Sequence, residues 1–395
     1  MSTPYYLTAL GLCCALGDSK ETVWANAVKG SRAGMQQRQG FLPDDKAIVV
    51  GEVSAVLPDS SAWPAQFRTR NNQLAALAYA QIATEVAALR QRYGSSRIAV
   101  VLGSSTSGIA EGEQALIEYQ AGNGFADSFH YQMQEMLAPA EFISYLAGVT
   151  GPAYCLSTAC SSSARALLSA ASLLQAGLAD AVITGGVDSL CRLTLQGFSA
   201  LEAVSAGWCQ PFSANRDGIN IGEAAALFVM QKSANGIALL GGGSSSDAHH
   251  MSAPHPEGLG AISAISQACA NAGITREQLD YINLHGTATA LNDSMESAAL
   301  AALGLQGTAA SSTKSLTGHT LGAAGALEAA LCWLTLSDYN QPQYLLPHSW
   351  DGEADPALPA LNLVQPGQTK PVKYCLSNSF AFGGNNVALI LGNTA

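Results

Sequence analysis

The sequence predicts an α/β fold, and three features of the chain support that prediction. Short apolar runs alternate with longer Ala-rich stretches along the whole chain, which is the pattern of strands and helices in turn. Hydrophobic residues make up 48% of the 395 residues and charged residues only 12%, so most of the sheet surface must be buried. Two passages, 98–107 and 281–290, each resemble a strand ending in a turn of small residues, which indicates a duplicated unit.

The predicted strands are short runs rich in aliphatic residues and bounded by glycine or polar residues. They are Tyr6–Gly11, Ile98–Gly103, Ala181–Gly186, Ala224–Met230, Tyr281–Leu284 and Val387–Leu391. The predicted helices are longer and carry apolar residues at intervals of three and four. They are Ala75–Arg92, Ser161–Ala176, Ala261–Ala272, Ser294–Leu303 and Gly325–Leu336.

The duplicated unit divides the chain into two halves, which we predict at residues 1–240 and 241–395. The seam between them is expected in Ser233–Ser246, a run of small residues that contains three consecutive glycines. Such a run is typical of a connection between structural units. The proline-rich segment Gly352–Pro366 is expected to be a surface loop.

Net charge and cysteine content narrow the possible functions. The formal charge of −11 argues against nucleic-acid binding as the main task, although a local basic patch could still bind an acidic partner. The nine cysteines include no CxxC pair, so zinc sites, iron–sulfur sites and a disulfide framework are not expected. Most of the cysteines fit small buried apolar residues, so we expect a reduced, cytoplasmic setting. The N-terminus also lacks the signal-peptide pattern. The apolar segment His319–Leu336 contains a histidine and Glu328, and we expect a buried helix there and no membrane span.

One cysteine lies in a run of small polar residues that leads into a predicted helix. The run 156–167, LSTACSSSARAL, places Cys160 at the start of that helix. Unpaired amides and the helix dipole are expected to favour the thiolate there, which is the reactive form. A buried structural cysteine beside a serine-rich cap fits the same residues, so this run alone leaves both interpretations open.

Two histidines of the second half stand in comparable settings. His285 follows the strand Tyr281–Leu284 and opens the run HGTAT, at an edge where α/β folds place their sites; a structural histidine bonded to the backbone is the alternative. His319 lies in the Gly-rich run 314–325, KSLTGHTLGAAG, before a helix that carries Glu328. This run lacks the spacing of a phosphate-binding P-loop, and its glycines could equally serve close helix packing.

A fourth run, NSFAFGGNN at 378–386, sets two phenylalanines beside two glycines, either in a loop that can hinge or in an ordinary turn before the last strand.

Together and in this order, the four runs resemble the β-ketoacyl-acyl-carrier-protein synthases, or ketosynthases, of the elongating Cys-His-His type. The resemblance covers nearly the whole chain. It implies a thiolase-like fold, with two pseudo-duplicated βαβ-rich halves in a layered αβαβα sandwich. It also implies decarboxylative Claisen condensation of an acyl-enzyme thioester with malonyl-acyl carrier protein, which gives 3-oxoacyl-acyl carrier protein.

By this resemblance, Cys160 is the nucleophile that takes the acyl group. His285 and His319 would stabilise the enolate that forms when the malonyl thioester loses carbon dioxide. Lys314 and Glu328 would orient the two histidines and the hydrogen bonds of the site.

The resemblance implies further residues around this group. Thr287 and Thr289 would bond the pantetheine amides, Phe380 would lie in the substrate site, and Thr106 would line the acyl tunnel. Phe382 would be the gate, and its backbone amide would form the oxyanion hole together with the amide of Cys160. Asp293 and Glu296 would lie behind the histidines. No permanently bound cofactor and no metal are implied. The substrates would be carried on the phosphopantetheine of an acyl carrier protein.

A chain with so few charges is expected to be oligomeric, and the resemblance implies a homodimer or a heterodimer with a chain-length-factor-like homologue. Docking of an acidic carrier protein on an acidic enzyme requires a local basic patch. Arg68 and Arg70, in QFRTRN, and Arg216 are the candidates. The alternative is that the first two solvate a helix start and that Arg216 pairs with Asp217.

The chain departs from the family pattern after the strand Ala224–Met230, because Gln231–Gly243 is too short for the usual helix. This departure favours a specialised pathway, such as polyketide or polyene assembly, over housekeeping fatty-acid synthesis. Two other functions compete: a non-catalytic scaffold in a synthase heterodimer, and a non-decarboxylating, thiolase-type acyltransferase. The presence of Cys160 together with both histidines argues against them.

Overall fold

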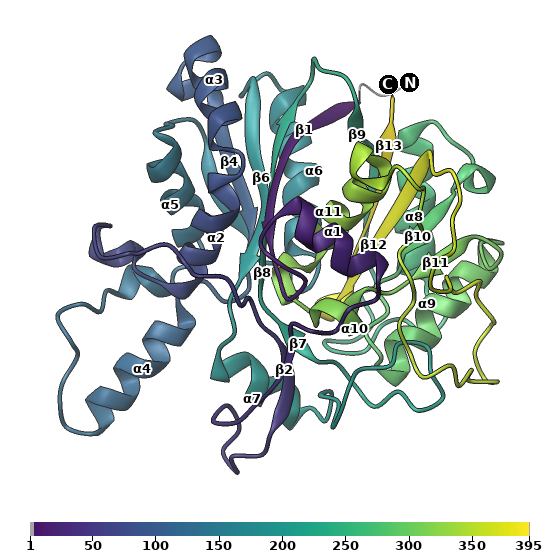
Figure 1. Ribbon diagram of the computed structural model, residues 1–395, viewed down its shortest axis with the longest axis horizontal. Coiled ribbons are helices and arrows are strands. Elements are labelled where there is room, and N and C mark those ends of the chain that lie inside the picture. Colours follow the sequence, from purple (N-terminus) through teal and green to yellow (C-terminus); the bar gives the residue numbers. More distant parts are fainter. Residues whose placement is uncertain (1–3, 395) are drawn as a thin grey trace.

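Ten strands form one sheet through the middle of the protein, and helices cover it (Figure 1). The computed structural model describes residues 4–394. The first half of the sheet contains β1 (Tyr5–Cys13), β4 (Ile98–Gly103), β5 (Ala153–Leu156), β6 (Ala181–Asp188) and β8 (Ala224–Gln231). The second half contains β9 (Ile237–Ser246), β10 (Tyr281–Asn283), β11 (Ala309–Ser311), β12 (Tyr374–Ala381) and β13 (Asn385–Asn393). A small separate sheet joins β2 (Met35–Arg38), β3 (Ile48–Gly51) and β7 (Ile221–Gly222).

The two halves of the sheet have the same topology. The strand order is β11-β10-β12-β13-β9-β1-β8-β6-β4-β5, so the halves meet where β9 pairs with β1. In each half, three strands are parallel and the two strands nearest the junction are antiparallel to their neighbours. This repeated order fits the duplicated unit expected from the sequence. The boundary between residues 240 and 241 falls inside β9 and stays a prediction.

Helices form the other layers of the predicted αβαβα sandwich (Figure 1). α6 (Ser162–Gln175) and α11 (Ala324–Leu336) lie between the two halves of the sheet and share one apolar core with both. α2 (Arg70–Ala80), α3 (Ala83–Tyr93) and α5 (Ala138–Ala147) cover the outer face of the first half. α8 (Leu259–Ala272) and α9 (Ala290–Ala302) cover the outer face of the second. The remaining helices are α1 (Lys20–Val28), α4 (Ile109–Gln120), α7 (Arg192–Ala200) and α10 (Lys314–Thr317).

One predicted helix differs from the structure, and the predicted seam contains a strand. The predicted helix Ala75–Arg92 is in fact two helices, α2 and α3, because the side chain of Gln81 bonds to the backbone of β1 at Leu12 and turns the chain there. The predicted seam Ser233–Ser246 covers most of the short connection after β8 and then β9, the first strand of the second half in the chain. Its glycines permit close packing of α8: a Cβ at Gly243 would lie 2.0 Å from the carbonyl oxygen of Ala264.

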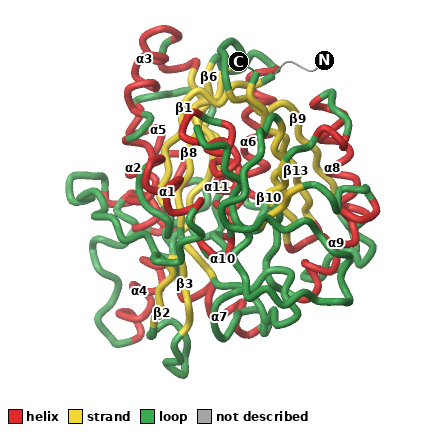
Figure 2. Tube along the Cα trace, turned by 45° about the vertical axis from the view of Figure 1, so that its right-hand side comes forward, coloured by secondary structure: helices red, strands yellow, loops and turns green. Residues whose placement is uncertain are grey.

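The shortened segment after β8 was predicted correctly, since β8 leads into β9 without a helix between them. Gly352–Pro366 contains no helix or strand, as expected. Loops gather at the end of the molecule where α4, α7 and α10 are labelled (Figure 2). None of the helices within residues 4–394 has the length and apolar character needed to cross a membrane.

Candidate active site

Cys160 lies in a sharp turn just before α6. Ala159 has a φ of +51°, a conformation that few side chains adopt, and it turns the chain so that Cys160 precedes the capping residue Ser161. Gly103, at the end of β4, makes room for the start of this helix, since a Cβ there would lie 2.3 Å from the amide nitrogen of Ser163. The small residues therefore let the end of β4 pack directly against the start of α6, next to Cys160.

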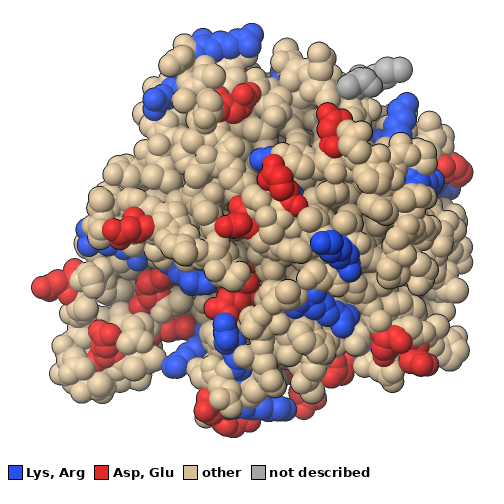
Figure 3. Space-filling view, in the orientation of Figure 1, with Lys and Arg blue, Asp and Glu red and all other residues tan. Residues whose placement is uncertain are grey.

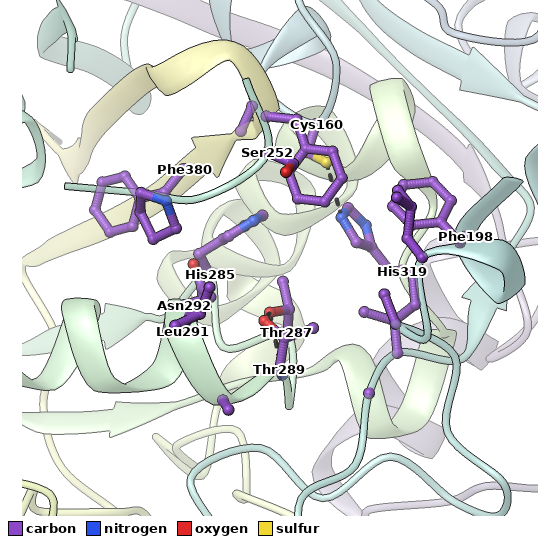
Figure 4. A pocket seen from close by; sticks show the side chains of 18 of the residues that line it. Cys160, Phe198, Ser252, His285, Thr287, Thr289, Leu291, Asn292, His319 and Phe380 are labelled. Carbon is purple, nitrogen blue, oxygen red and sulfur yellow. Dashed lines mark hydrogen bonds between the residues drawn. The ribbon is translucent and has the colours of Figure 1, made fainter. Parts of the chain in front are cut away.

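Both histidines of the second half face this cysteine (Figure 4). His319 Nε2 lies 3.0 Å from Cys160 Sγ. One ring nitrogen of His285, one of His319 and the sulfur all lie within 4.8 Å of one another. The two imidazole rings meet edge to face, with centroids 5.5 Å apart. Cys160 is thus buried beside two histidines that lie more than 100 positions after it in the sequence.

The hydrogen bonds behind the rings fix which nitrogen carries the proton. The amide of Leu321 donates to His319 Nδ1 at 3.2 Å, so the proton of that ring is on Nε2. Lys314 Nζ lies 3.3 Å from His285 Nδ1, and an ammonium group can only donate, so His285 also carries its proton on Nε2. Burial lowers the pKa of both histidines well below the usual value. Both rings are therefore neutral and aim an N–H group toward the sulfur.

The spacing of Cys160, His285 and His319 would also suit a metal ion. A metal ligand needs a lone pair on the nitrogen that faces the ion. Here the Nδ1 atoms are occupied by Leu321 and Lys314, which leaves the Nε2 atoms as donors. The chemistry of this group fits an oxygen that gains negative charge better than it fits a cation.

The resting state of Cys160 differs from the thiolate expected from the sequence. Burial raises the pKa of its thiol to about 12, although the Lys314 charge and the amides of Cys160 and Phe382 lower it. Desolvation thus outweighs the helix start. The same two amides point at the sulfur, where they can also bond an oxygen on the carbon that it attacks.

A buried ion pair supports the histidines. Lys314 Nζ contacts a carboxylate oxygen of Glu328 and donates to the carbonyl oxygen of His285 at 2.5 Å. Burial raises the pKa of Glu328 to about 7, against the opposing effect of the ammonium group. The pair therefore lies where the sequence places it, directly behind His285.

Two further buried carboxylates accept hydrogen bonds from backbone amides, and one of them holds the turn at His285. Glu296 accepts hydrogen bonds from the amides of His285 and Gly286 at 2.9 and 2.8 Å, and burial raises its pKa to about 7. Asp293 accepts from the amide of Phe212 at 2.7 Å, and burial raises its pKa to about 6. Both act on the backbone and do not contact the sulfur.

A pocket of about 340 Å³ leads to the cysteine and the histidines. The predicted substrate-site residues that line it are Thr287, Thr289, Phe380 and Phe382, and the docking candidate Arg216 lines it as well. The hydroxyl groups of the two threonines lie 2.9 Å apart (Figure 4). Residues Asn378–Ala381, expected in a loop, end β12, and the turn to β13 follows at Phe382–Gly384.

Phe382 lies at the mouth of this pocket and is 37% exposed. Its ring packs against Phe198 of α7, with centroids 5.6 Å apart. Gly383 and Gly384 follow with φ values of +77° and +70°, which glycine adopts without strain.

Thr106 is not among the residues that line the pocket. It is fully buried, and its hydroxyl group donates to Asp188 Oδ1 at 2.8 Å. Asp188 itself was missed by sequence reasoning. Its bonds reach residues more than 80 positions away, and no local pattern signals them.

The three arginines proposed for docking have different surroundings. Arg68 is exposed and donates to the carbonyl oxygen of Trp63. Arg70 forms two hydrogen bonds to Glu223, a fully buried carboxylate. Arg216 pairs with Asp355 at 2.6 Å, and not with its neighbour in sequence.

Known proteins resemble the chain over its whole length. Models of the beta-ketoacyl synthase N-terminal and C-terminal domains match residues 6–235 and 237–345. A 3-oxoacyl-[acyl-carrier-protein] synthase 2 of Rhizobium meliloti (strain 1021) is 30% identical and spans 98% of this chain and 97% of its own length. The ketosynthase ApeO of Xenorhabdus doucetiae, solved in complex with its chain length factor ApeC, is 45% identical, with a TM-score of 0.94 over 99% of this chain and 98% of that one. The ishigamide ketosynthase/chain length factor is 25% identical, with a TM-score of 0.87 over the full length of both chains.

Proposed function

The chain belongs to the beta-ketoacyl synthase family, and on that premise we propose how its residues divide the reaction. The enzyme is a 3-oxoacyl-[acyl-carrier-protein] synthase of thiolase-like fold, which condenses an enzyme-bound acyl thioester with malonyl-acyl carrier protein and releases carbon dioxide. The contact of 3.0 Å between His319 Nε2 and Cys160 Sγ, with His285 beside both, carries the proposal.

In the first step, Cys160 Sγ attacks the thioester carbonyl of the acyl carrier protein. A bond forms between this sulfur and the acyl carbon, the bond to the pantetheine sulfur breaks, and the cysteine proton passes to the leaving sulfur. The amides of Cys160 and Phe382 donate to the oxygen that becomes negative. Because one thiol replaces another, a resting thiol with a raised pKa is compatible with this step.

In the second step, the malonyl carboxylate leaves as carbon dioxide, and the electron pair of the broken bond forms an enolate. The Nε2–H groups of His285 and His319 donate to the enolate oxygen, in a buried site where such bonds are strong. The enolate carbon attacks the acyl carbonyl, a carbon–carbon bond forms, and the bond to Cys160 Sγ breaks. The released thiolate takes up a proton. Thr287 and Thr289 are proposed to bond the pantetheine amides, and Phe382 to open and close the pocket.

The second subunit is proposed to cover an apolar surface around α4. Exposed apolar side chains gather on α4 and the segment after it: Leu116, Ile117, Tyr119, Phe125 and Tyr131. The rings of Tyr119 and Phe125 stack at 4.6 Å, and the segment projects from the body of the protein (Figure 1). β5 is the last strand of the sheet order, so its outer edge is available to a partner strand. A chain-length-factor-like homologue or an identical copy would fit there; static light scattering and co-purification distinguish the two.

A specialised pathway is proposed over housekeeping fatty-acid synthesis. The identity of 45% to ApeO exceeds the 30% to the synthases named 3-oxoacyl-[acyl-carrier-protein] synthase 2, and both spans cover nearly the whole chain. Polyketide or polyene assembly is the proposed context. A cytoplasmic location is proposed as well, since all nine cysteines are free thiols.

The carrier protein, with its phosphopantetheine arm, is proposed to dock through Arg68. Charged side chains are scattered over a mostly uncharged face in Figure 3, so a single exposed arginine can matter locally. Arg70 and Arg216 have their charges matched by Glu223 and Asp355, which reduces their availability to a partner.

One assay separates the competing functions. Labelled carbon dioxide is measured from malonyl carrier protein, with and without an acyl donor and with and without the partner subunit. An elongating synthase releases carbon dioxide and forms 3-oxoacyl product when the donor is present. A thiolase-type acyltransferase releases none, and a scaffold subunit adds nothing to the activity of its partner, so either result contradicts the proposal.

A further inference from the structure

We propose that Asp188 is a positioning residue, which fixes the orientation and tautomer of His319 by holding the turn that follows this histidine. The inference rests on the proposed role of His319 as an N–H donor. Asp188 contacts neither Cys160 nor a histidine, and it does not line the pocket. Its effect must therefore pass through the backbone.

The carboxylate of Asp188 is a fully buried acceptor at the end of β6. Oδ1 accepts from the hydroxyl groups of Ser104 and Thr106 at 2.9 and 2.8 Å. It also accepts from the amides of Ser105 and Thr106 at 2.7 and 2.8 Å. Four donors thus hold this oxygen in place against the turn after β4. The direction of the second oxygen is set as a consequence.

That second oxygen bonds to the segment just after His319. Oδ2 accepts from the amide of Ala323 at 3.0 Å. Ala323 ends a short 3-10 turn, Leu321–Ala323, whose first residue donates its amide to His319 Nδ1 at 3.2 Å. The carboxylate and the imidazole therefore hold opposite ends of one three-residue turn.

The turn needs such support because its backbone is strained. Leu321 has a φ of +51°, which is unfavourable for a leucine. We call the Asp188 carboxylate and its hydrogen bonds to Ser104–Thr106 and Ala323 the clamp. Gly322 packs directly on it, since a Cβ there would lie 2.7 Å from Asp188 Oδ2 and 2.6 Å from Ser105 Oγ. If the clamp opens, we expect Leu321 to relax and its amide to leave Nδ1. His319 could then carry its proton on either nitrogen, and the donor aimed at the enolate would be lost part of the time.

The clamp also joins the two halves of the active site. Asp188 and the turn Ser104–Thr106 belong to the half that carries Cys160, whereas Ala323 and His319 belong to the other. Gly103, next to this turn, supports the start of α6. One carboxylate therefore sets the position of the histidine relative to the helix of the nucleophile.

The main test is Asp188→Asn in the full enzyme with its partner subunit. An asparagine oxygen can serve the four donors, but its amide group cannot accept from Ala323. In protein labelled with ¹⁵N-histidine, the wild-type His319 signals should report a proton on Nε2, and those of the variant a mixture of tautomers. The signals are assigned by their loss in His319→Gln. Decarboxylation of malonyl carrier protein should fall about tenfold or more, less than the 10²–10³-fold expected when a whole donor is lost, with KM unchanged.

Two further variants separate positioning from general destabilisation. Ala323→Pro removes the amide that bonds to Asp188 Oδ2 and to the carbonyl oxygen of Thr320, at a φ of −77° that proline can adopt, and it should reproduce the tautomer mixture. Asp280→Asn also removes a carboxylate that accepts two amides, those of Lys373 and Tyr374, but it should leave the His319 tautomer unchanged. A single Nε2–H tautomer in both Asp188→Asn and Ala323→Pro would overturn the inference. Because the tautomer is read without turnover, failure of the proposed function would show separately, as a wild-type enzyme that does not decarboxylate.

Discussion

Replacing Glu328 by glutamine removes the carboxylate that contacts the ammonium group of Lys314. Both side chains are buried, with side-chain exposures of 2% for the lysine and 4% for the glutamate. Removing one partner of a buried ion pair typically costs about 3–5 kcal/mol, because the other charge stays without a partner. We therefore expect Glu328→Gln and Lys314→Met each to lower the free energy of unfolding by about that amount.

The double variant Lys314→Met/Glu328→Leu is the matched control. It removes both charges together, so its loss should be clearly smaller than the sum of the two single losses. Urea unfolding followed by the fluorescence of the five tryptophans measures all three variants. If each single variant loses less than about 1 kcal/mol, as exposed pairs do, the reasoning about this buried pair is wrong.

Activity should fall in Glu328→Gln beyond any loss of stability. Without the carboxylate, the ammonium group of Lys314 loses the contact that holds it beside His285, and it then donates to His285 Nδ1 only part of the time. The Nε2–H donor of His285 would then be present only part of the time. Decarboxylation measured at a temperature where the variant stays folded should be reduced, while acylation of Cys160 persists.

Other residues give further expected outcomes. His285→Ala and His319→Ala should each lower decarboxylation by roughly 10²–10³-fold while acylation of Cys160 persists at least in part; normal decarboxylation in either variant would exclude that ring as an enolate donor. Burial lowers the pKa of His348 from 6.5 to about 4, so the unfolded chain binds the proton first as the pH falls, and stability present above pH 6.5 is lost on the way down to pH 4. His348→Gln can keep both hydrogen bonds of this ring but does not titrate. Over that pH window its free energy of unfolding should therefore fall by up to about 3 kcal/mol less than that of the wild type. Equal losses in the two proteins, measured by urea unfolding, would contradict this. Arg68→Glu should raise KM for carrier-bound substrate, less so at higher salt, and leave pantetheine-analogue turnover unchanged; equal loss on both substrates would indicate damage to the fold instead.

The candidate catalytic residues could be proposed from the sequence because they lie near the ends of regular elements. Cys160 precedes α6, and His285 lies just after β10. These positions follow from local patterns of apolar and small residues. The motifs then match one family in order and spacing, so the reaction could be inferred before the geometry was known.

The connections between distant residues could not be predicted in this way. Asp188 bonds to residues 82 to 135 positions away, and Arg70 pairs with a carboxylate 153 positions away. Nothing in the neighbouring sequence marks such partners. The sequence therefore offered Arg70 as a docking candidate without showing that Glu223 matches its charge.

The secondary structure of the glycine-rich run could not be predicted either. Its glycines predicted a connection between the two halves, because glycine is common in loops. In the structure they lie in a strand, where the missing side chain lets α8 pack onto the sheet. The distinction depends on the neighbour in space, which a single sequence does not contain.

The most direct test of the whole account is to detect the acyl group on Cys160 and then its transfer. The enzyme with its partner subunit is incubated with acyl carrier protein, digested and examined by mass spectrometry, before and after addition of malonyl carrier protein. We predict an acyl adduct on the peptide that contains Cys160, which disappears on addition of the malonyl substrate as carbon dioxide and 3-oxoacyl carrier protein form. An adduct on another residue, or an adduct on Cys160 that malonyl carrier protein does not discharge, would contradict the account.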